Sequence, residues 1–123
     1  MVSMKLSTRE GGRAVVVLRG ELDVADAASV AAALAAVAAR APQVVVDLAG
    51  LAFIDSSGVA ALVLARVQAR RAGGDLVLAA PHDQVLRVLA VTCLAEGFSV
   101  HASVNEAAAS AGRRSRPVAL PVP

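Results

Sequence analysis

The sequence is poor in aromatic residues and in cysteine. It has no tryptophan, no tyrosine and two phenylalanines, Phe53 and Phe98, and its one cysteine is Cys93. Proteins that stack the bases of single-stranded nucleic acid use aromatic platforms, which this chain lacks. A single cysteine excludes an intrachain disulfide and fits a reducing cytoplasm, and we expect Cys93 to be a small buried apolar residue.

Other classes of protein are also disfavoured. The longest apolar stretch, residues 27–39, is mostly alanine and is shorter than the roughly 20 residues that span a bilayer. The first ten residues do not read as a signal peptide, because they carry charges and no long apolar run. His82 and His101 have no His or Cys neighbour at ligand spacing, so we expect no metal site. The sequence around Ser56 is not a G-x-S-x-G nucleophile elbow, so we expect no enzyme activity.

The positive charge lies mainly at the end of the chain. The whole sequence has a net charge of +2, and without the three arginines at 113, 114 and 116 the net charge of residues 1–112 is −1. A near-neutral body argues against direct binding of nucleic acid. Residues 112–123, GRRSRPVALPVP, are rich in Arg and Pro without periodicity, and we expect them to form a disordered tail after one domain at 1–111.

Hydrophobic residues make up 57% of the chain, mainly Ala, Val and Leu, which predicts a folded α/β domain. The pattern predicts strands and helices in the order ββαβαβαβα, and therefore a mixed, mostly parallel sheet flanked by helices. We expect strands at Met4–Thr8, Ala14–Leu18, Val44–Leu48, Leu76–Ala79 and Phe98–Val100. We expect helices at about 26–40, 59–71 and 81–92 and after Ser103, and a loop at 49–55.

The most informative motif is Asp55-Ser56-Ser57-Gly58, which follows a predicted strand and opens a predicted helix. The first turn of a helix has unpaired N–H groups and a partial positive charge, so a phosphate on Ser56 would be well accommodated. Asp55 either orients Ser56 or simply caps the helix, and Ser57 is either a capping partner or a second phosphosite. We expect Gly58 to keep the first turn uncluttered, so that another protein can approach closely.

Several blocks then resemble one known family. The stretch at 47–62, DLAGLAFIDSSGVAAL, resembles the signature of the anti-sigma factor antagonists of the STAS family. The blocks GELD at 20–23, GGDLVL at 73–78 and VLRVL at 85–89 are similar to the family's other blocks, in order and at the right spacing. The resemblance covers roughly residues 5–111. Two departures are Cys93, where the family often has Gly, and Val59-Ala60-Ala61, where Leu-Gly is common.

The resemblance implies a mechanism. An anti-sigma factor that is itself a serine kinase would phosphorylate Ser56, using ATP bound by the kinase and no cofactor of this chain. The unphosphorylated protein would bind the anti-sigma factor and free the sigma factor, and a serine phosphatase would restore this state. Asp23, in the GELD block, would shape the partner surface or cap a helix, and Asp55, Ser57 and Gly58 would contribute to the same surface. The alternatives are a STAS module that senses a ligand or acts as a scaffold without phosphorylation, and a small hydrolase.

Overall fold

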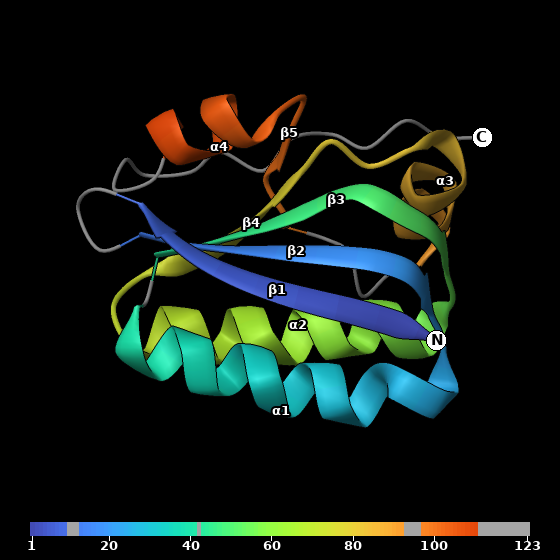
Figure 1. Cartoon of the computed structure of the whole chain (residues 1–123), viewed down its shortest axis with the longest axis horizontal. Helices are drawn as coiled ribbons and strands as arrows, with labels where there is room; N and C mark the ends of the chain where they lie inside the picture. The colour runs from blue at the N-terminus through green and yellow to red at the C-terminus, as the bar shows by residue number, and fades with distance from the viewer. Residues whose placement is uncertain (10–12, 42, 93–96, 111–123) are drawn as a thin grey trace.

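The computed structural model describes residues 1–9, 13–41, 43–92 and 97–110, which form a five-stranded sheet with helices on both faces (Figure 1). The elements are β1 (Val2–Arg9), β2 (Arg13–Leu22), α1 (Val24–Arg40), β3 (Gln43–Ile54), α2 (Ser56–Arg71), β4 (Asp75–Ala79), α3 (Asp83–Val91), β5 (Val100–His101) and α4 (Val104–Ser110). The predicted α/β class and order of elements are confirmed. The predictions for Cys93 and for the tail at 112–123 lie outside the described residues.

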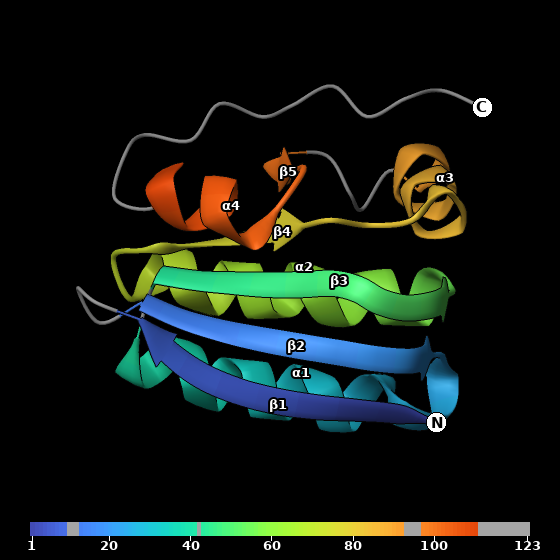
Figure 2. The ribbon, with the colours of Figure 1, turned by 45° about the horizontal axis from the view of Figure 1, so that its top comes forward.

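The strands lie in the order β1-β2-β3-β4-β5, which is also their order in the sequence. β1 pairs antiparallel with β2, and the other neighbours are parallel (Figure 2). The helices α1 and α2 cover one face of the sheet, and α3 and α4 lie on the other side (Figure 1). Because β2, β3, β4 and β5 run in the same direction, the helices that follow β2, β3 and β4 begin at the same edge of the sheet.

Two clusters of buried side chains stabilise the sheet, one on each face. The larger one, the main core, joins the sheet to α1 and α2 through residues such as Leu34 and Leu62. The smaller one contains Val45 and Ala107, and its apolar members are all Val or Ala. The central run Val44–Leu48 sends side chains to both clusters, as expected for a strand that is covered on both faces.

The third strand extends beyond its predicted end, so the loop expected at 49–55 is wrong. β3 continues to Ile54, and its pairing with β2 shifts register twice, once after Asp47 and again after Leu51. Each shift inserts an extra residue into β3, as in a β-bulge. In this part of β3 the buried residues are Leu48, Leu51 and Ile54, one in every three. Because this spacing is not the alternation of buried and exposed residues that predicts a strand, the sequence pattern does not indicate a strand here.

The last strand is also displaced from its prediction. β5 comprises Val100 and His101, whereas we expected Phe98–Val100. Phe98 is instead a fully buried member of the main core. A large apolar side chain at this position thus indicates a buried residue, but it does not indicate that the residue pairs in the sheet.

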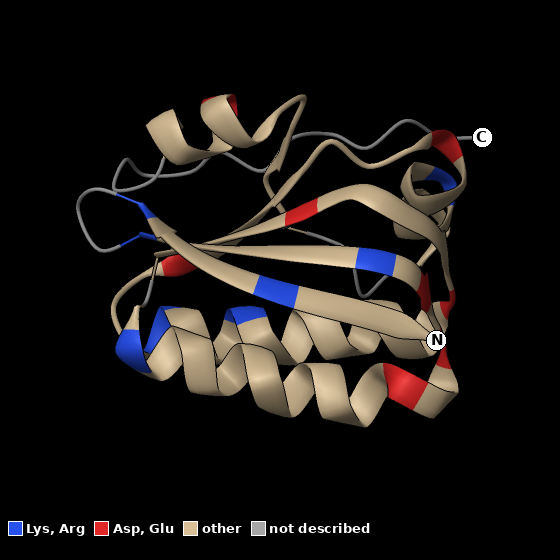
Figure 3. Ribbon diagram, in the orientation of Figure 1, with Lys and Arg blue, Asp and Glu red and all other residues tan. Residues whose placement is uncertain are grey.

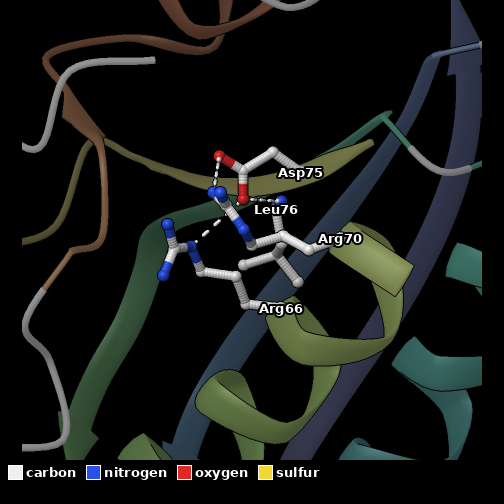
Figure 4. A network of polar contacts seen from close by, with 4 residues as sticks. All are labelled: Arg66, Arg70, Asp75 and Leu76. Atoms are coloured by element: carbon white, nitrogen blue, oxygen red, sulfur yellow. Dashed lines mark hydrogen bonds and ion pairs between the residues drawn. The ribbon is translucent and has the colours of Figure 1, made fainter. Parts of the chain in front are cut away.

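A network of charges fixes the end of α2 to the start of β4 (Figure 4). The Arg66 Nε donates to Asp75 Oδ1 at 3.1 Å, and Arg70 Nη1 lies 3.5 Å from Asp75 Oδ2. The Leu76 N–H donates to the same Asp75 Oδ1 at 2.8 Å. The Arg66 guanidinium also lies 5.7 Å from the centre of the Phe98 ring, within the range of a cation–π contact. No helix in the described part of the chain is long and apolar enough to cross a bilayer.

Candidate functional site

The candidate site lies where β2 and β3 end side by side. Leu22 and Ile54 are the last paired residues of these two parallel strands. The next residues along the chain, Asp23 and Asp55, are the N-caps of α1 and α2. The fold therefore brings the two sequence-predicted acids, which are far apart in the sequence, to neighbouring helix N-termini.

Both acids cap their helices through the carboxylate. The Asp23 Oδ1 accepts a hydrogen bond from the Ala25 N–H at 3.0 Å, and the Asp55 Oδ1 accepts one from the Gly58 N–H at 3.0 Å. The capping alternative is thus confirmed for both residues. The Asp55 N–H in turn donates to the Leu22 carbonyl at 3.2 Å, which joins the start of α2 to the end of β2.

The two serines differ in their exposure. Ser56 is the first residue of α2 and is exposed, and its hydroxyl has no hydrogen-bond partner among the described residues. Ser57 is half-buried, and its hydroxyl likewise makes no hydrogen bond within that part of the chain. The capping role that we considered for Ser57 is therefore corrected, because Asp55 supplies the side-chain cap.

Gly58 has a different role from the expected one. A Cβ at this position would lie 2.7 Å from Ile54 Cγ1 and 2.8 Å from the Leu22 carbonyl oxygen. Gly58 is buried and faces the ends of β2 and β3, so it does not provide space for an approaching protein. The glycine instead allows the first turn of α2 to pack directly on the strands.

Acidic side chains surround the site. Figure 3 shows Asp and Glu at the ends of β2 and β3 and at the starts of α1 and α3, whereas Lys and Arg gather at the opposite ends of α1 and α2. The acids of this edge are Glu21, Asp23, Asp26, Asp55 and Asp83. One of them has a structural role as well, because the Asp26 Oδ2 accepts from the Val2 N–H at 3.1 Å. The N-terminal ammonium lies 3.7 Å from the same Asp26 Oδ2, so a group bound at this edge would meet negative charge mainly from the other acids.

Two apolar side chains are exposed beside these acids. Val24, the first residue of α1, is 75% exposed, and Phe53, just before the end of β3, is 41% exposed. Phe53 pairs across the strands with Glu21. The surface next to Ser56 thus combines exposed apolar side chains with acidic groups.

Gln84 is part of the site, although no pattern in the sequence predicts it. Its side-chain Oε1 accepts from the Ile54 N–H at 3.2 Å, and its Nε2 donates to the Ile54 carbonyl at 3.3 Å. His82 lies nearby, and its Nε2 donates to the Ala49 carbonyl. Only the fold could reveal these contacts, because a polar residue at the start of a helix is unremarkable in a sequence.

The other candidate residues lie outside this group. The His101 Nε2 is within 3.2 Å of the Ser110 hydroxyl, in the part of the molecule formed by β5 and α4. Across residues 1–9, 13–41, 43–92 and 97–110, no three His, Cys, Asp or Glu side chains are grouped so that they could hold a metal ion.

Solved structures share this fold. A Thermotoga maritima protein assigned as an anti-sigma factor antagonist is 19% identical, with a TM-score of 0.80 over 89% of this chain and 95% of that one. An anti-sigma factor antagonist from Mycobacterium paratuberculosis is 23% identical, with a TM-score of 0.76 over 89% and 93%. The unphosphorylated anti-sigma factor antagonist SpoIIAA is 22% identical, with a TM-score of 0.74 over 86% and 93%.

Two comparisons of the sequence gave different results. No curated protein sequence matches the chain significantly. The STAS domain model matches residues 5–107, which include every strand from β2 to β5, the candidate site and most of α4. A match over this much of the chain is decisive, and the protein belongs to the STAS domain family.

Proposed function

We propose that the protein is an anti-sigma factor antagonist that is switched by phosphorylation of Ser56. The observation that carries this proposal is the exposed Ser56 hydroxyl, which makes no hydrogen bond within the described residues and stands at the first position of α2. A kinase can reach such a hydroxyl without breaking an internal contact. The similarity to structures of anti-sigma factor antagonists supports the same role, and one of them, SpoIIAA of Bacillus, has also been solved in a phosphorylated form.

The switch acts through charge at the surface. A phosphate on Ser56 adds a charge of about −1.5 to −2 beside the acidic edge described above. The N-terminus of α2 offers backbone donors to the phosphate, whereas the neighbouring carboxylates add to its negative charge. A partner that contacts Ser56 in its unmodified form would meet a bulky, strongly hydrated anion, and the complex would dissociate. In this proposal the unphosphorylated protein is therefore the form that binds the partner.

The proposal includes three partners. An anti-sigma factor with serine kinase activity binds ATP, contacts the surface around Ser56 and phosphorylates it. A serine phosphatase removes the phosphate and returns the antagonist to its binding form. The sigma factor is released without touching this chain. On this proposal the protein itself is not an enzyme, needs no cofactor and works in the cytoplasm.

The first experiment measures the intact mass of the protein purified from its own host. The wild type should contain a species heavier by one phosphate, and Ser56→Ala should lack it. Ser57→Ala is the matched control, because it removes a hydroxyl one residue away, and it should keep the phosphate. If wild type carries no phosphate in any growth phase or stress condition, the proposal fails, and small-molecule binding or a scaffold role becomes the hypothesis to test.

The second experiment tests the direction of the switch. The kinase that modifies Ser56 is purified, and its affinity for Ser56→Ala and Ser56→Asp is measured by calorimetry. The alanine variant should bind like wild type and stay bound in ATP, whereas the aspartate variant should bind at least tenfold more weakly. Equal binding of the two variants would refute charge exclusion even if Ser56 is phosphorylated.

A further inference from the structure

Among the described residues, one edge of β3 has no strand neighbour near the candidate site. β4 pairs with β3 only over Gln43–Asp47, and β3 continues to Ile54. The backbone N–H and C=O groups of an unpaired strand edge need other partners when they are withdrawn from water. The chain that leaves β4 supplies these partners through side chains at the start of α3.

Gln84 replaces the missing strand at Ile54. The Ile54 N–H can only donate and the Ile54 carbonyl can only accept, so the Gln84 oxygen must face the first and its nitrogen the second. The side-chain amide of Gln84 therefore makes two hydrogen bonds to the backbone of Ile54, with donor–acceptor distances of 3.2 Å and 3.3 Å. A carboxylate lacks the donor, and a thioether lacks the donor and is only a weak acceptor, so the double hydrogen bond is specific to an amide side chain.

The residue that Gln84 holds is next to the switch turn, which we define as residues 55–58. The Ile54 N–H bonds toward α3, and the following N–H, that of Asp55, bonds toward the Leu22 carbonyl of β2. The chain is therefore fixed from both sides immediately before Ser56. The Ser56 hydroxyl has no such anchor of its own within the described residues, so its position depends on these neighbours.

We propose that Gln84 is a positioning residue for phosphorylation of Ser56, because its double hydrogen bond holds the switch turn in the conformation that the kinase recognises. This inference rests on the proposed function. Without Gln84 the turn samples other conformations, and the kinase binds only the fraction that presents Ser56 correctly. The apparent KM for the protein rises in inverse proportion to that fraction, whereas phosphate transfer within the bound complex is unchanged.

The first measurement does not depend on phosphorylation. Gln84→Met keeps the length and apolar volume of the side chain but removes both hydrogen bonds. Amide hydrogen exchange at Ile54 should become about tenfold faster or more, while exchange at Val44–Val46 in the middle of β3 stays unchanged. Gln68→Met is the matched control, because Gln68 is exposed on α2 and its side chain makes no hydrogen bond within the described residues.

In the second measurement, an extract of the host cells supplies the kinase, and ATP is added to it. The rate of Ser56 phosphorylation is followed against the concentration of added protein. Gln84→Met should raise the apparent KM about threefold to tenfold with little change in maximal rate, whereas Gln68→Met should match wild type. Gln84→Glu keeps an acceptor for the Ile54 N–H but turns a second carboxylate oxygen toward the Ile54 carbonyl, so its KM should rise at least as much as that of Gln84→Met.

The outcomes separate the two proposals. If wild type is phosphorylated at Ser56 and Gln84→Met has the wild-type KM despite faster exchange at Ile54, the positioning role is refuted and the proposed function stands. If Gln84→Met lowers only the maximal rate, or unfolds while Gln84→Glu behaves as wild type, the role is also refuted. If extracts from every growth phase and stress condition fail to phosphorylate wild type, the proposed function fails. Unchanged exchange at Ile54 in Gln84→Met would then refute the structural part of the inference as well.

Discussion

The two ends of α2 treat their polar groups in opposite ways. At the C-terminal end, the Asp75 carboxylate binds Arg66, Arg70 and the Leu76 N–H, so these three charges are paired with one another. At the N-terminal end, Asp55 caps the helix but the Ser56 hydroxyl is left without a partner among the described residues. The first end fixes the helix on the sheet, and the second keeps one reactive group available to another molecule.

Each end of α2 carries charges of the sign that the helix dipole favours. The difference between the two ends therefore does not come from the dipole. Asp55 stands at the positive N-terminus, and Arg70 and Arg71 stand in the last turn, where cations are favourable. The fold could have used Ser56 as a cap, since serine is a preferred N-cap residue. The capping role of Asp55 leaves Ser56 one position further along, where its hydroxyl is not needed by the helix.

The largest loss of stability is expected at the C-terminal end. Asp75→Ala should lower the free energy of unfolding by about 2–3 kcal/mol, because the Arg66 guanidinium loses its partner while it remains mostly buried. The side chain of Arg66 is 21% exposed, whereas that of Arg70 is 58% exposed. Arg70→Ala is therefore the control, and it should cost about 0.5 kcal/mol or less in urea denaturation. Equal losses for the two variants would mean that the network is a surface feature.

A smaller loss is expected at the N-terminal end. Asp55→Ala removes the acceptor of the Gly58 N–H and should cost about 1 kcal/mol, measured by the same denaturation. Asp55→Asn keeps an oxygen acceptor at the cap and removes the charge, so it should stay within a few tenths of a kcal/mol of wild type. A loss of stability in Asp55→Asn as large as that in Asp55→Ala would show that charge, and not the hydrogen bond, is what Asp55 contributes.

The layout of the fold could be predicted because local patterns and global structure agree. The Val-rich run at 44–48 is buried on both faces, and the helix after Asp23 buries Val30 and Leu34 at helical spacing. The second half of β3 could not be predicted, because its two register shifts replace alternation by burial of every third residue. Such shifts arise from how β3 pairs with β2, and this pairing cannot be read from the sequence of β3 alone.

The site could be predicted in part for the same reason. Ser56 was found because its motif is local, and Asp23 and Asp55 were found because caps precede helices. Gln84 could not be found, because it bonds to a residue 30 positions away and only the fold brings the two together. Gly58 was found for the wrong reason, since whether a missing Cβ faces solvent or the strands depends on tertiary packing.

The smallest effect on stability is expected at Ser56 itself. Ser56→Ala removes a hydroxyl that makes no hydrogen bond within the described residues and places a good helix former in an exposed first turn. Its free energy of unfolding should lie within about 0.5 kcal/mol of the wild-type value. The variant should nevertheless lose the phosphate that the proposed function assigns to this residue. A loss above about 1 kcal/mol would show that the hydroxyl supports the fold, and any loss of binding by this variant would then be a structural effect. A neutral variant would instead mean that the fold does not need this hydroxyl, in contrast to the Asp75 carboxylate at the opposite end of α2, which binds Arg66, Arg70 and the Leu76 N–H.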